Sequence, residues 1–329
     1  MSKYTALVVE KSEEGMSHSL VQLDTNDLPE GEVLIKVSFS SVNYKDAMSM
    51  TGVPGVTRQY PHTPGIDAAG VVAESTDGNF SPGDEIICIG YDLGMNTSGG
   101  FGEYIRVPSK WISKLPEGLS LKDSMIIGTA GFTAALCLEK LELMGASPED
   151  GPVLVTGATG GVGSICVMLL SQLGYEVVAC TGKTEKKAFL MDLGAGSILD
   201  RAELSEPNKR PVLAPRWAHA IDCVGGEILS NIIKELSPQG SVAICGLVAS
   251  PGFSATVLPF ILRGVNVLGI DSVEIPIDAK NRIWDRLASD WKLSHLSSLS
   301  NEITLSGLGE TTEKLLAGLG SGRTLVKVG

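Results

Sequence analysis

The sequence has few of the residues that mark secreted, metal-bound or membrane-spanning proteins. Its six cysteines are scattered through 329 residues, mostly inside apolar runs, and none forms a CxxC pair or a metal-like spacing. Such cysteines are typical of reduced core residues in a cytosolic protein. No run approaches the about 18 apolar residues that a membrane span needs. We therefore expect no disulfide framework, no metal site and no transmembrane segment.

Positive charge is also scarce. Lysine and arginine number 26 against 38 aspartates and glutamates, so the net charge is −12. This balance argues against a general nucleic-acid or anionic-membrane partner, and any anionic ligand must be held by a local basic cluster. The opening stretch MSKYTALVVEKSEEG lacks the apolar core of a signal peptide, so a cytoplasmic protein is expected. The four histidines are scattered and suggest no catalytic triad.

The chain shows two patterns that predict an α/β protein of two domains. Residues 1–125 consist of short apolar runs split by Gly, Pro, Asn and Asp, which predicts a β-rich domain. From Asp150, strand patterns alternate with helix-length patterns, which predicts a doubly wound parallel sheet with helices on both faces. The tail returns to strand, helix and strand. We predict one domain of residues 1–125 completed by 300–329, a second of residues 126–299, and a cleft between them.

The most informative motif is VTGATGGVGS, residues 155–164. A β-branched run enters a turn with Gly157, Gly160, Gly161 and Gly163, and an apolar helix follows. Glycines let a phosphate approach the backbone, and the helix N-terminus behind them favours an anion. Because strand, glycine turn, helix and second strand occur in this order, the motif predicts a dinucleotide site. A methyltransferase with an adenosyl cofactor and a turn without ligand are the alternatives.

The end of the second strand distinguishes between nicotinamide cofactors. NAD sites and adenosyl sites usually carry an acid there for the ribose hydroxyls. This chain instead has Thr181, Gly182 and Lys183, and Arg201 follows the third strand. An acid would repel a 2′-phosphate, whereas a hydroxyl and two cations can bind one. The sequence therefore predicts NADPH as the cofactor and disfavours the methyltransferase.

Further stretches give the whole chain a family resemblance. They are SSVNYKDAM (residues 40–48), PHTPGIDAAGVV (61–72), AIDCVGG (220–226), PFILRGVNVLGIDSV (259–273) and GRTLVKV (322–328). With the glycine turn, they resemble the medium-chain dehydrogenase/reductase superfamily, and more narrowly its zinc-free acryloyl-CoA reductase branch, often labelled quinone oxidoreductase. The resemblance implies a GroES-like catalytic domain, a Rossmann domain and a homodimer.

Two departures from the zinc enzymes of that superfamily are visible. Those enzymes use a Gly-His-Glu motif and a cysteine as metal ligands, and this chain has Gly65, Ile66 and Asp67 at that place. The structural-zinc lobe with its close cysteines is also missing, since Cys88 stands alone before residue 137. The resemblance therefore implies a zinc-independent enzyme.

The resemblance also implies the site residues. It places Tyr44 against the nicotinamide, as a candidate proton donor. Asn43 would orient the cofactor or the carbonyl of the substrate, and Asp46 would have a structural role. Arg323 is expected to face the anionic substrate, with Lys45, Arg58 and Arg263 as further candidates for the coenzyme A phosphates. The implied cofactor shell consists of Tyr44, Thr159, Gly160, Gly161, Val162, Thr181, Gly182, Lys183, Arg201, Leu247, Ile261 and Ser272.

The resemblance implies NADPH-dependent reduction of the activated double bond of acryloyl-CoA to propanoyl-CoA. Hydride reaches the β-carbon, and the charge that collects on the thioester oxygen is stabilised by nearby donors. A quinone or enone reductase on the same scaffold is the first alternative. A non-catalytic NADPH-binding protein is the second.

Overall fold

The computed structural model describes residues 2–329, which fold as two compact units. Among the described residues, the first unit comprises 2–129 and 272–329, and the second comprises 130–271. Helix α2 (Leu121–Leu143) begins in the first unit and ends in the second. The segment 272–299 belongs to the first of these units.

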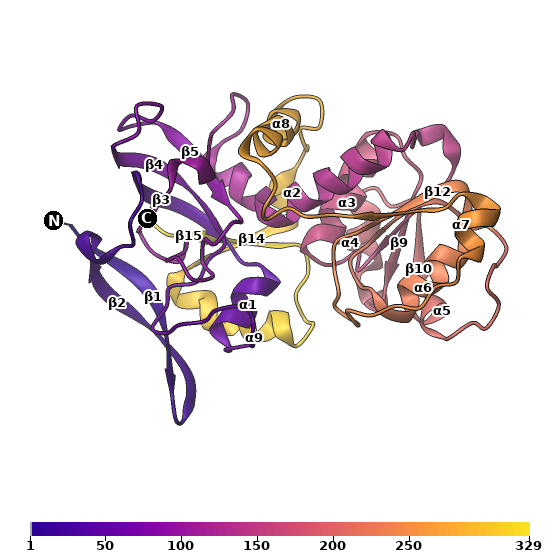
Figure 1. Cartoon of the computed structure of the whole chain (residues 1–329), viewed down its shortest axis with the longest axis horizontal. Coiled ribbons are helices and arrows are strands. Elements are labelled where there is room, and N and C mark those ends of the chain that lie inside the picture. Colours follow the sequence, from indigo (N-terminus) through magenta and orange to yellow (C-terminus); the bar gives the residue numbers. More distant parts are fainter. Residues whose placement is uncertain (1) are drawn as a thin grey trace. The chain divides into compact units, whose positions relative to one another are not determined.

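The first unit is built mostly on antiparallel strands, with one parallel pair, β14 and β15 (Figure 1). Strands β1 and β2 form a long hairpin, and the larger sheet has the order β14-β15-β3-β4-β5-β7, with β6 also paired to β3. The last strand, β15, pairs with β3, so the tail completes this sheet as expected. The elements are β1 (Lys3–Ser12), β2 (Gly15–Asp24), β3 (Val33–Ser41), α1 (Tyr44–Met50), β4 (Asp67–Ser75), β5 (Glu85–Ile89), β6 (Tyr104–Val107), β7 (Ile112–Lys114), α8 (Ile277–Ala288), β14 (Ser300–Thr304), α9 (Leu308–Leu316) and β15 (Arg323–Lys327).

The second unit contains a six-stranded parallel sheet, as the alternating pattern predicts. Its order, β10-β9-β8-β11-β12-β13, is the Rossmann order, in which ligands bind beyond the carboxyl ends of the two central strands. Its elements are β8 (Val153–Thr156), α3 (Gly161–Gln172), β9 (Val177–Thr181), α4 (Lys187–Asp192), β10 (Ser197–Asp200), α5 (Ala202–Ser205), β11 (Trp217–Asp222), α6 (Gly226–Glu235), β12 (Leu236–Ile244), α7 (Leu258–Arg263) and β13 (Asn266–Gly269).

Alternating side chains of this sheet face opposite layers. Leu154, Val178, Ala220 and Val242 pack with the apolar residues of α6 in one buried cluster. Their strand neighbours point to the other face, because successive side chains of a strand alternate. Helix α3 covers that second face, and α5 and α6 lie on the opposite side of the sheet (Figure 1).

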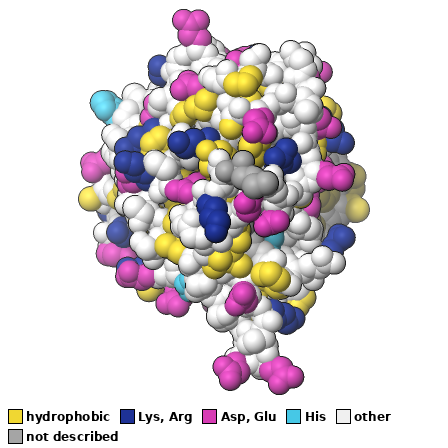
Figure 2. All heavy atoms as spheres, turned by 90° about the vertical axis from the view of Figure 1, so that its left-hand side faces the viewer, with side chains coloured by type: hydrophobic (Ala, Val, Ile, Leu, Met, Phe, Trp, Pro, Cys, Tyr) yellow, Lys and Arg dark blue, Asp and Glu magenta, His cyan; other side chains and the backbone are white. Residues whose placement is uncertain are grey.

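Helix α2 is the one helix of residues 2–329 that is long and apolar enough to cross a membrane by length and composition. Its apolar window is 78% buried inside the protein, as in a core helix. Figure 2 shows one face of the first unit, on which basic and acidic side chains are interspersed.

Candidate active site

The glycine-rich turn connects β8 to α3 at the carboxyl edge of the parallel sheet. Gly160 caps the helix, and α3 begins at Gly161. A Cβ at Gly163 would lie 2.3 Å from the carbonyl oxygen of Gly157, so only glycine lets the first turn of α3 pack against the loop. The first N–H groups of a helix have no intrahelical acceptor, and the helix dipole favours an anion there. The turn is therefore shaped to receive a phosphate.

The ends of β9 and β10 bring together the residues predicted to bind a 2′-phosphate. A Cβ at Gly182 would lie 2.9 Å from Cζ of Arg201, so the guanidinium lies against the backbone of Gly182. The N–H of Arg201 donates to the carbonyl of Thr181 at 2.9 Å, and the Thr181 hydroxyl accepts from the N–H of Lys183 at 3.0 Å. Burial lowers the pKa of Lys183. A bound dianion would offset that penalty.

Thr159 and Thr181 connect the glycine-rich turn to the cationic corner, which consists of Thr181, Gly182, Lys183 and Arg201. Their hydroxyl oxygens are 3.4 Å apart, and both side chains are buried. Leu247 and Ile261, which the resemblance adds to the shell, are 61% and 71% exposed. Leu247 follows β12, and Ile261 lies on α7. The second unit thus presents the turn and the cationic corner together.

Asp222, which the sequence did not single out, holds the loops at the switch point of the sheet. Its carboxylate accepts the hydroxyl of Thr156 at 2.6 Å and the N–H of Gly225 at 2.7 Å, and it is fully buried. Burial raises the pKa of Asp222, and these hydrogen bonds oppose that rise. The signal that could have identified Asp222 is that it is the one acidic residue in the largely apolar run HAIDCVGG, residues 219–226.

In the first unit, a capping box positions Tyr44 at the start of α1. The Asp46 carboxylate accepts the N–H of Asn43 at 2.7 Å and the N–H of Ile66 at 2.8 Å. Asp46 is fully buried and bonds to loop backbone, which confirms its expected structural role. Tyr44 is 44% exposed, so its ring can contact a ligand.

Arg323 and Asp67 belong to a buried hydrogen-bond network that reaches the start of α1 through Asn43. Ser41 lies between them: its hydroxyl donates to Asp67 Oδ2 at 2.6 Å and accepts from Arg323 Nη2 at 2.8 Å. The direct distance from Arg323 Nη2 to Asp67 Oδ2 is 3.8 Å. Asn43 joins both, donating its amide to Asp67 at 2.8 Å and accepting from Arg323 Nη1 at 3.2 Å.

The break in α2 makes room for this network. Gly128 has φ 51° and ψ −163°, which interrupts the helix. A Cβ there would lie 2.6 Å from Arg323 Nη2, from Asp67 Oδ2 and from Ser41 Oγ. The N–H of the next residue, Thr129, donates to Asp67 at 2.9 Å. Only glycine permits both the dihedral angle and the close approach.

The position of Arg323 corrects one expectation. The side chain is 3% exposed and also donates to the carbonyls of Ile126 and Val42, at 2.9 and 3.3 Å. It therefore does not face an incoming anionic substrate. Arg263 is likewise engaged, donating to the carbonyls of Lys234 and Leu236 at 3.1 and 2.9 Å. The carbonyl acceptors of both guanidinium groups come from residues far away in the sequence, so a sequence pattern does not reveal them.

The raised pKa of Asp46 predicts that the stability of the folded protein depends on pH. Burial, followed by the charge of Asp67, raises its pKa to about 7. A carboxyl with a raised native pKa favours folding below its unfolded pKa, and this contribution is lost as pH rises through the native value. The wild-type melting temperature should therefore exceed that of Asp46→Asn by more at pH 5 than at pH 8. Thermal unfolding across this range measures it, with the exposed Glu14→Gln as control. A difference that is constant or grows with pH would contradict the assignment.

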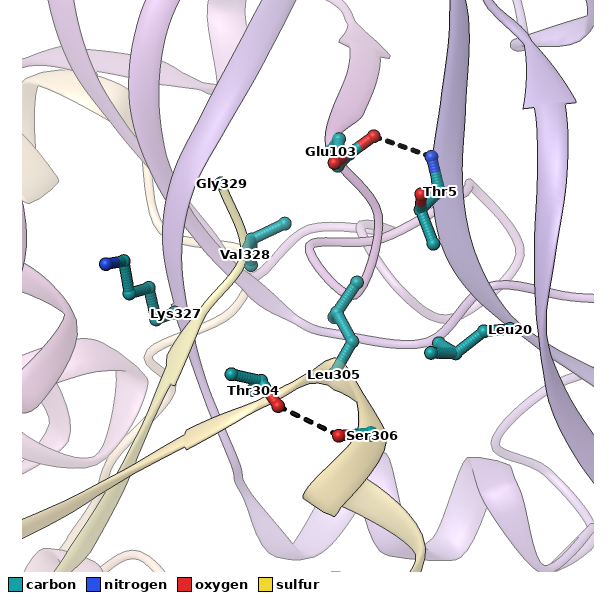
Figure 3. A pocket seen from close by; sticks show the side chains of 9 residues that line it. All are labelled: Thr5, Leu20, Glu103, Thr304, Leu305, Ser306, Lys327, Val328 and Gly329. Carbon is teal, nitrogen blue, oxygen red and sulfur yellow. Dashed lines mark hydrogen bonds between the residues drawn. The ribbon is translucent and has the colours of Figure 1, made fainter.

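A pocket of about 350 Å³ lies elsewhere in the first unit (Figure 3). Three of its polar side chains have partners: Glu103 accepts the N–H of Thr5 at 2.6 Å, and the hydroxyl oxygens of Thr304 and Ser306 are 2.9 Å apart. None of its lining residues belongs to the predicted site.

Within residues 2–329, no three or more His, Cys, Asp or Glu side chains are grouped so as to hold a metal ion. Position 66, where zinc enzymes have a ligand histidine, is a buried isoleucine. His62 Nε2 lies 2.9 Å from the carbonyl of Gly94, and His219 Nε2 lies 3.2 Å from Asp150. These two histidines make structural contacts.

Comparison with known proteins places this chain in a family. The alcohol dehydrogenase GroES-like domain model matches residues 29–117, and the zinc-binding dehydrogenase model matches residues 161–289. The acrylyl-CoA reductase AcuI of Ruegeria pomeroyi is 44% identical over 327 residues, covering 99% of each chain. The chain belongs to the medium-chain dehydrogenase/reductase superfamily. Within that superfamily it falls in the zinc-free acryloyl-CoA reductase-like branch, and both the GroES-like domain and the Rossmann-type sheet are confirmed.

Solved structures of this branch have nearly the same backbone. The yhdH oxidoreductase of Salmonella enterica, in complex with NADP, has a TM-score of 0.96 at 42% identity and covers 99% of this chain and 100% of its own. The yhfP protein of Bacillus subtilis, with NAD bound, has a TM-score of 0.97 at 43% identity with the same coverage. The name of that Bacillus protein describes a quinone oxidoreductase, and the two sequences match over 326 residues.

Proposed function

We propose that this chain reduces the 2,3 double bond of acryloyl-CoA to propanoyl-CoA, with NADPH as reductant. The observation that carries the proposal is the 44% identity, across 99% of both chains, to the acrylyl-CoA reductase of Ruegeria pomeroyi. Acryloyl-CoA, NADPH and one proton give propanoyl-CoA and NADP⁺. Measuring NADPH oxidation with acryloyl-CoA, crotonoyl-CoA and a quinone side by side tests it.

The residues of the second unit fit NADPH. The turn at Gly157, Thr159, Gly160, Gly161 and Val162 would receive the pyrophosphate, and Thr181, Gly182, Lys183 and Arg201 the 2′-phosphate. Three observations support this assignment: Arg201 is in close contact with Gly182, Lys183 directly follows Gly182, and the motif contains no acid. When bound, NADPH supplies the hydride. Leu247, Ile261 and Ser272 remain proposed contacts of the same cofactor.

The first unit would supply the polar groups for the substrate. As hydride is accepted at the β-carbon, charge collects on the thioester oxygen, and O–H or N–H donors stabilise it. Tyr44, partly exposed at the start of α1, is the proposed proton donor or relay. Asn43 and Arg323 are proposed to position α1, and with it Tyr44, because both belong to the buried network that holds this helix. Lys45 and Arg58 stay candidates for the coenzyme A phosphates.

Loss of either cation at the corner should weaken NADPH binding selectively. A charge-assisted hydrogen bond contributes about 1.5–3 kcal/mol. We expect Lys183→Ala and Arg201→Ala each to raise the Kd for NADPH about tenfold or more. The Kd for NADH should barely change, because NADH lacks the 2′-phosphate. Fluorescence titration with both coenzymes measures the difference.

Lys187→Ala is the matched control, because it removes the same charge from an exposed position at the start of α4. It should leave both affinities within about twofold of wild type. Equal losses for NADPH and NADH in the Lys183 and Arg201 variants would refute the 2′-phosphate assignment.

We also propose a cytoplasmic homodimer, with residues 1–125 and 300–329 as catalytic domain and residues 126–299 as NADP-binding domain. The dimer is supported by β13, an edge strand of the parallel sheet, and by the exposed Leu262 of α7, the helix that precedes β13 in the chain.

Quinone or enone reduction is the second candidate function, favoured by the name of the Bacillus subtilis relative. The same cofactor residues would serve it, and only the substrate would differ. A protein that binds NADPH without turning over any of the three substrates would point instead to a non-catalytic role.

A further inference from the structure

Two cysteines occupy matching positions at the carboxyl edge of the parallel sheet. Cys223 directly follows β11, and Cys245 directly follows β12. The N–H of Cys245 donates to the carbonyl of Asp222 at 3.0 Å, which extends the strand pairing to this level. The two Sγ atoms are 3.6 Å apart, and no disulfide joins them in this structure.

The two thiols lie on the face of the sheet that α3 covers. Ala220 and Val242 point to the α6 face, so three residues further along each strand Cys223 and Cys245 point to the other face. There Cys137, from α2, hydrogen-bonds to Cys245. Cys180 belongs to the α6 cluster instead, so it is separated from this group by the sheet.

The surroundings make the two sulfurs chemically unequal. Hydrogen bonds from the thiols of Cys137 and Cys223 lower the pKa of Cys245, against the effect of burial. The hydrogen bond to Cys245 and burial raise the pKa of Cys223. Both residues are only partly buried. A thiolate next to a second thiol, with access for a small molecule, is the usual arrangement of a redox-active pair.

We propose that Cys223 and Cys245 are a redox modification site, which a hydroperoxide converts into a reversible intramolecular disulfide. The Cys245 thiolate attacks the peroxide, the O–O bond breaks, and a sulfenic acid forms while one water or alcohol leaves. The Cys223 sulfur then attacks the Cys245 sulfur, the S–O bond breaks, and a second water leaves. Two thiols are oxidised by two electrons and one hydroperoxide is reduced.

Closing the disulfide requires the sulfurs to approach from 3.6 Å to about 2.05 Å. Cys223 borders the glycine-rich turn, because a Cβ at Gly157 would lie 3.4 Å from the Cβ of Cys223. Cys245 directly precedes Gly246, whose Cβ would lie 2.1 Å from the carbonyl oxygen of Cys223. The close packing transmits the movement of the two cysteines to the turn. On the proposed function, oxidation therefore lowers the affinity for NADPH.

The test treats the full chain with hydrogen peroxide and follows it by intact mass and peptide mapping. Oxidation should lower the mass by about 2 Da, remove two of the six thiols from alkylation and yield a linked Cys223–Cys245 peptide. Dithiothreitol should reverse all three. The Kd for NADPH should rise at least about fivefold in the oxidised protein.

Cys245→Ala should give no linked peptide, and Cys180→Ala, from the opposite face of the sheet, should give it as wild type does. Sulfinic acid at Cys245 without the linked peptide, or a different pair of linked cysteines, would overturn the proposal. A linked peptide with unchanged NADPH affinity would overturn its effect on the cofactor. If the reduced protein does not bind NADPH, the proposed function fails, whereas the mass data still decide the disulfide.

Discussion

Replacing Arg323 with alanine is expected to destabilise the protein by about 3–5 kcal/mol, because breaking a buried ion pair leaves an uncompensated charge. Asp67 is fully buried, and the carbonyls of Ile126 and Val42 would also lose their donor. Arg323→Lys should recover only part of the loss, since one ammonium group cannot reach the same acceptors as the guanidinium. Urea unfolding of each variant measures the change.

Lys314→Ala is the matched control in the same unit. Its ammonium pairs with Glu310 at 2.6 Å on the surface, with side chains 61% and 75% exposed. Removing such a pair should change the stability by less than about 1 kcal/mol. An Arg323→Ala protein as stable as this control would contradict a structural role for the buried network.

The second large effect concerns the substrate. We expect kcat/KM for acryloyl-CoA to exceed that for benzoquinone by at least about a hundredfold, roughly 2.7 kcal/mol of transition-state preference. The nucleotide part of coenzyme A supplies binding energy that can orient the acryloyl group, and a simple quinone has no such part. Crotonoyl-CoA should be a poorer substrate than acryloyl-CoA, because its methyl group hinders and deactivates the β-carbon.

Tyr44→Phe separates the possible proton sources in the same assay. A lower kcat with little change in KM is expected if the tyrosine hydroxyl delivers or relays the proton. A kcat equal to that of wild type would assign the proton to water. A benzoquinone rate that matches or exceeds the acryloyl-CoA rate would favour the quinone reductase and contradict the acyl-CoA substrate.

The sequence by itself determined the local parts of the second unit. The glycine turn, the two cations after neighbouring strands and the strand–helix alternation are short-range patterns. The Rossmann order follows from parallel strands with right-handed crossovers. Because residues after adjacent parallel strands meet at one edge, Thr181 and Arg201 could be expected together before the structure was known. The return of β15 to the first sheet was predicted from a different signal, the strand, helix and strand pattern of the tail.

Only the tertiary structure decided where the buried polar groups lie. Arg323 was expected to face an anionic substrate, but it meets Asp67, Ser41 and Asn43 from distant parts of the chain. Gly128 is one glycine among 39, and its need for a left-handed dihedral appears only where that network crowds it. Cys223 and Cys245 stand 22 residues apart and form a pair only because β11 and β12 are neighbours. Hydrophobic periodicity reports which face of an element is buried, whereas the partner of a buried charge or thiol depends on long-range packing that periodicity does not encode.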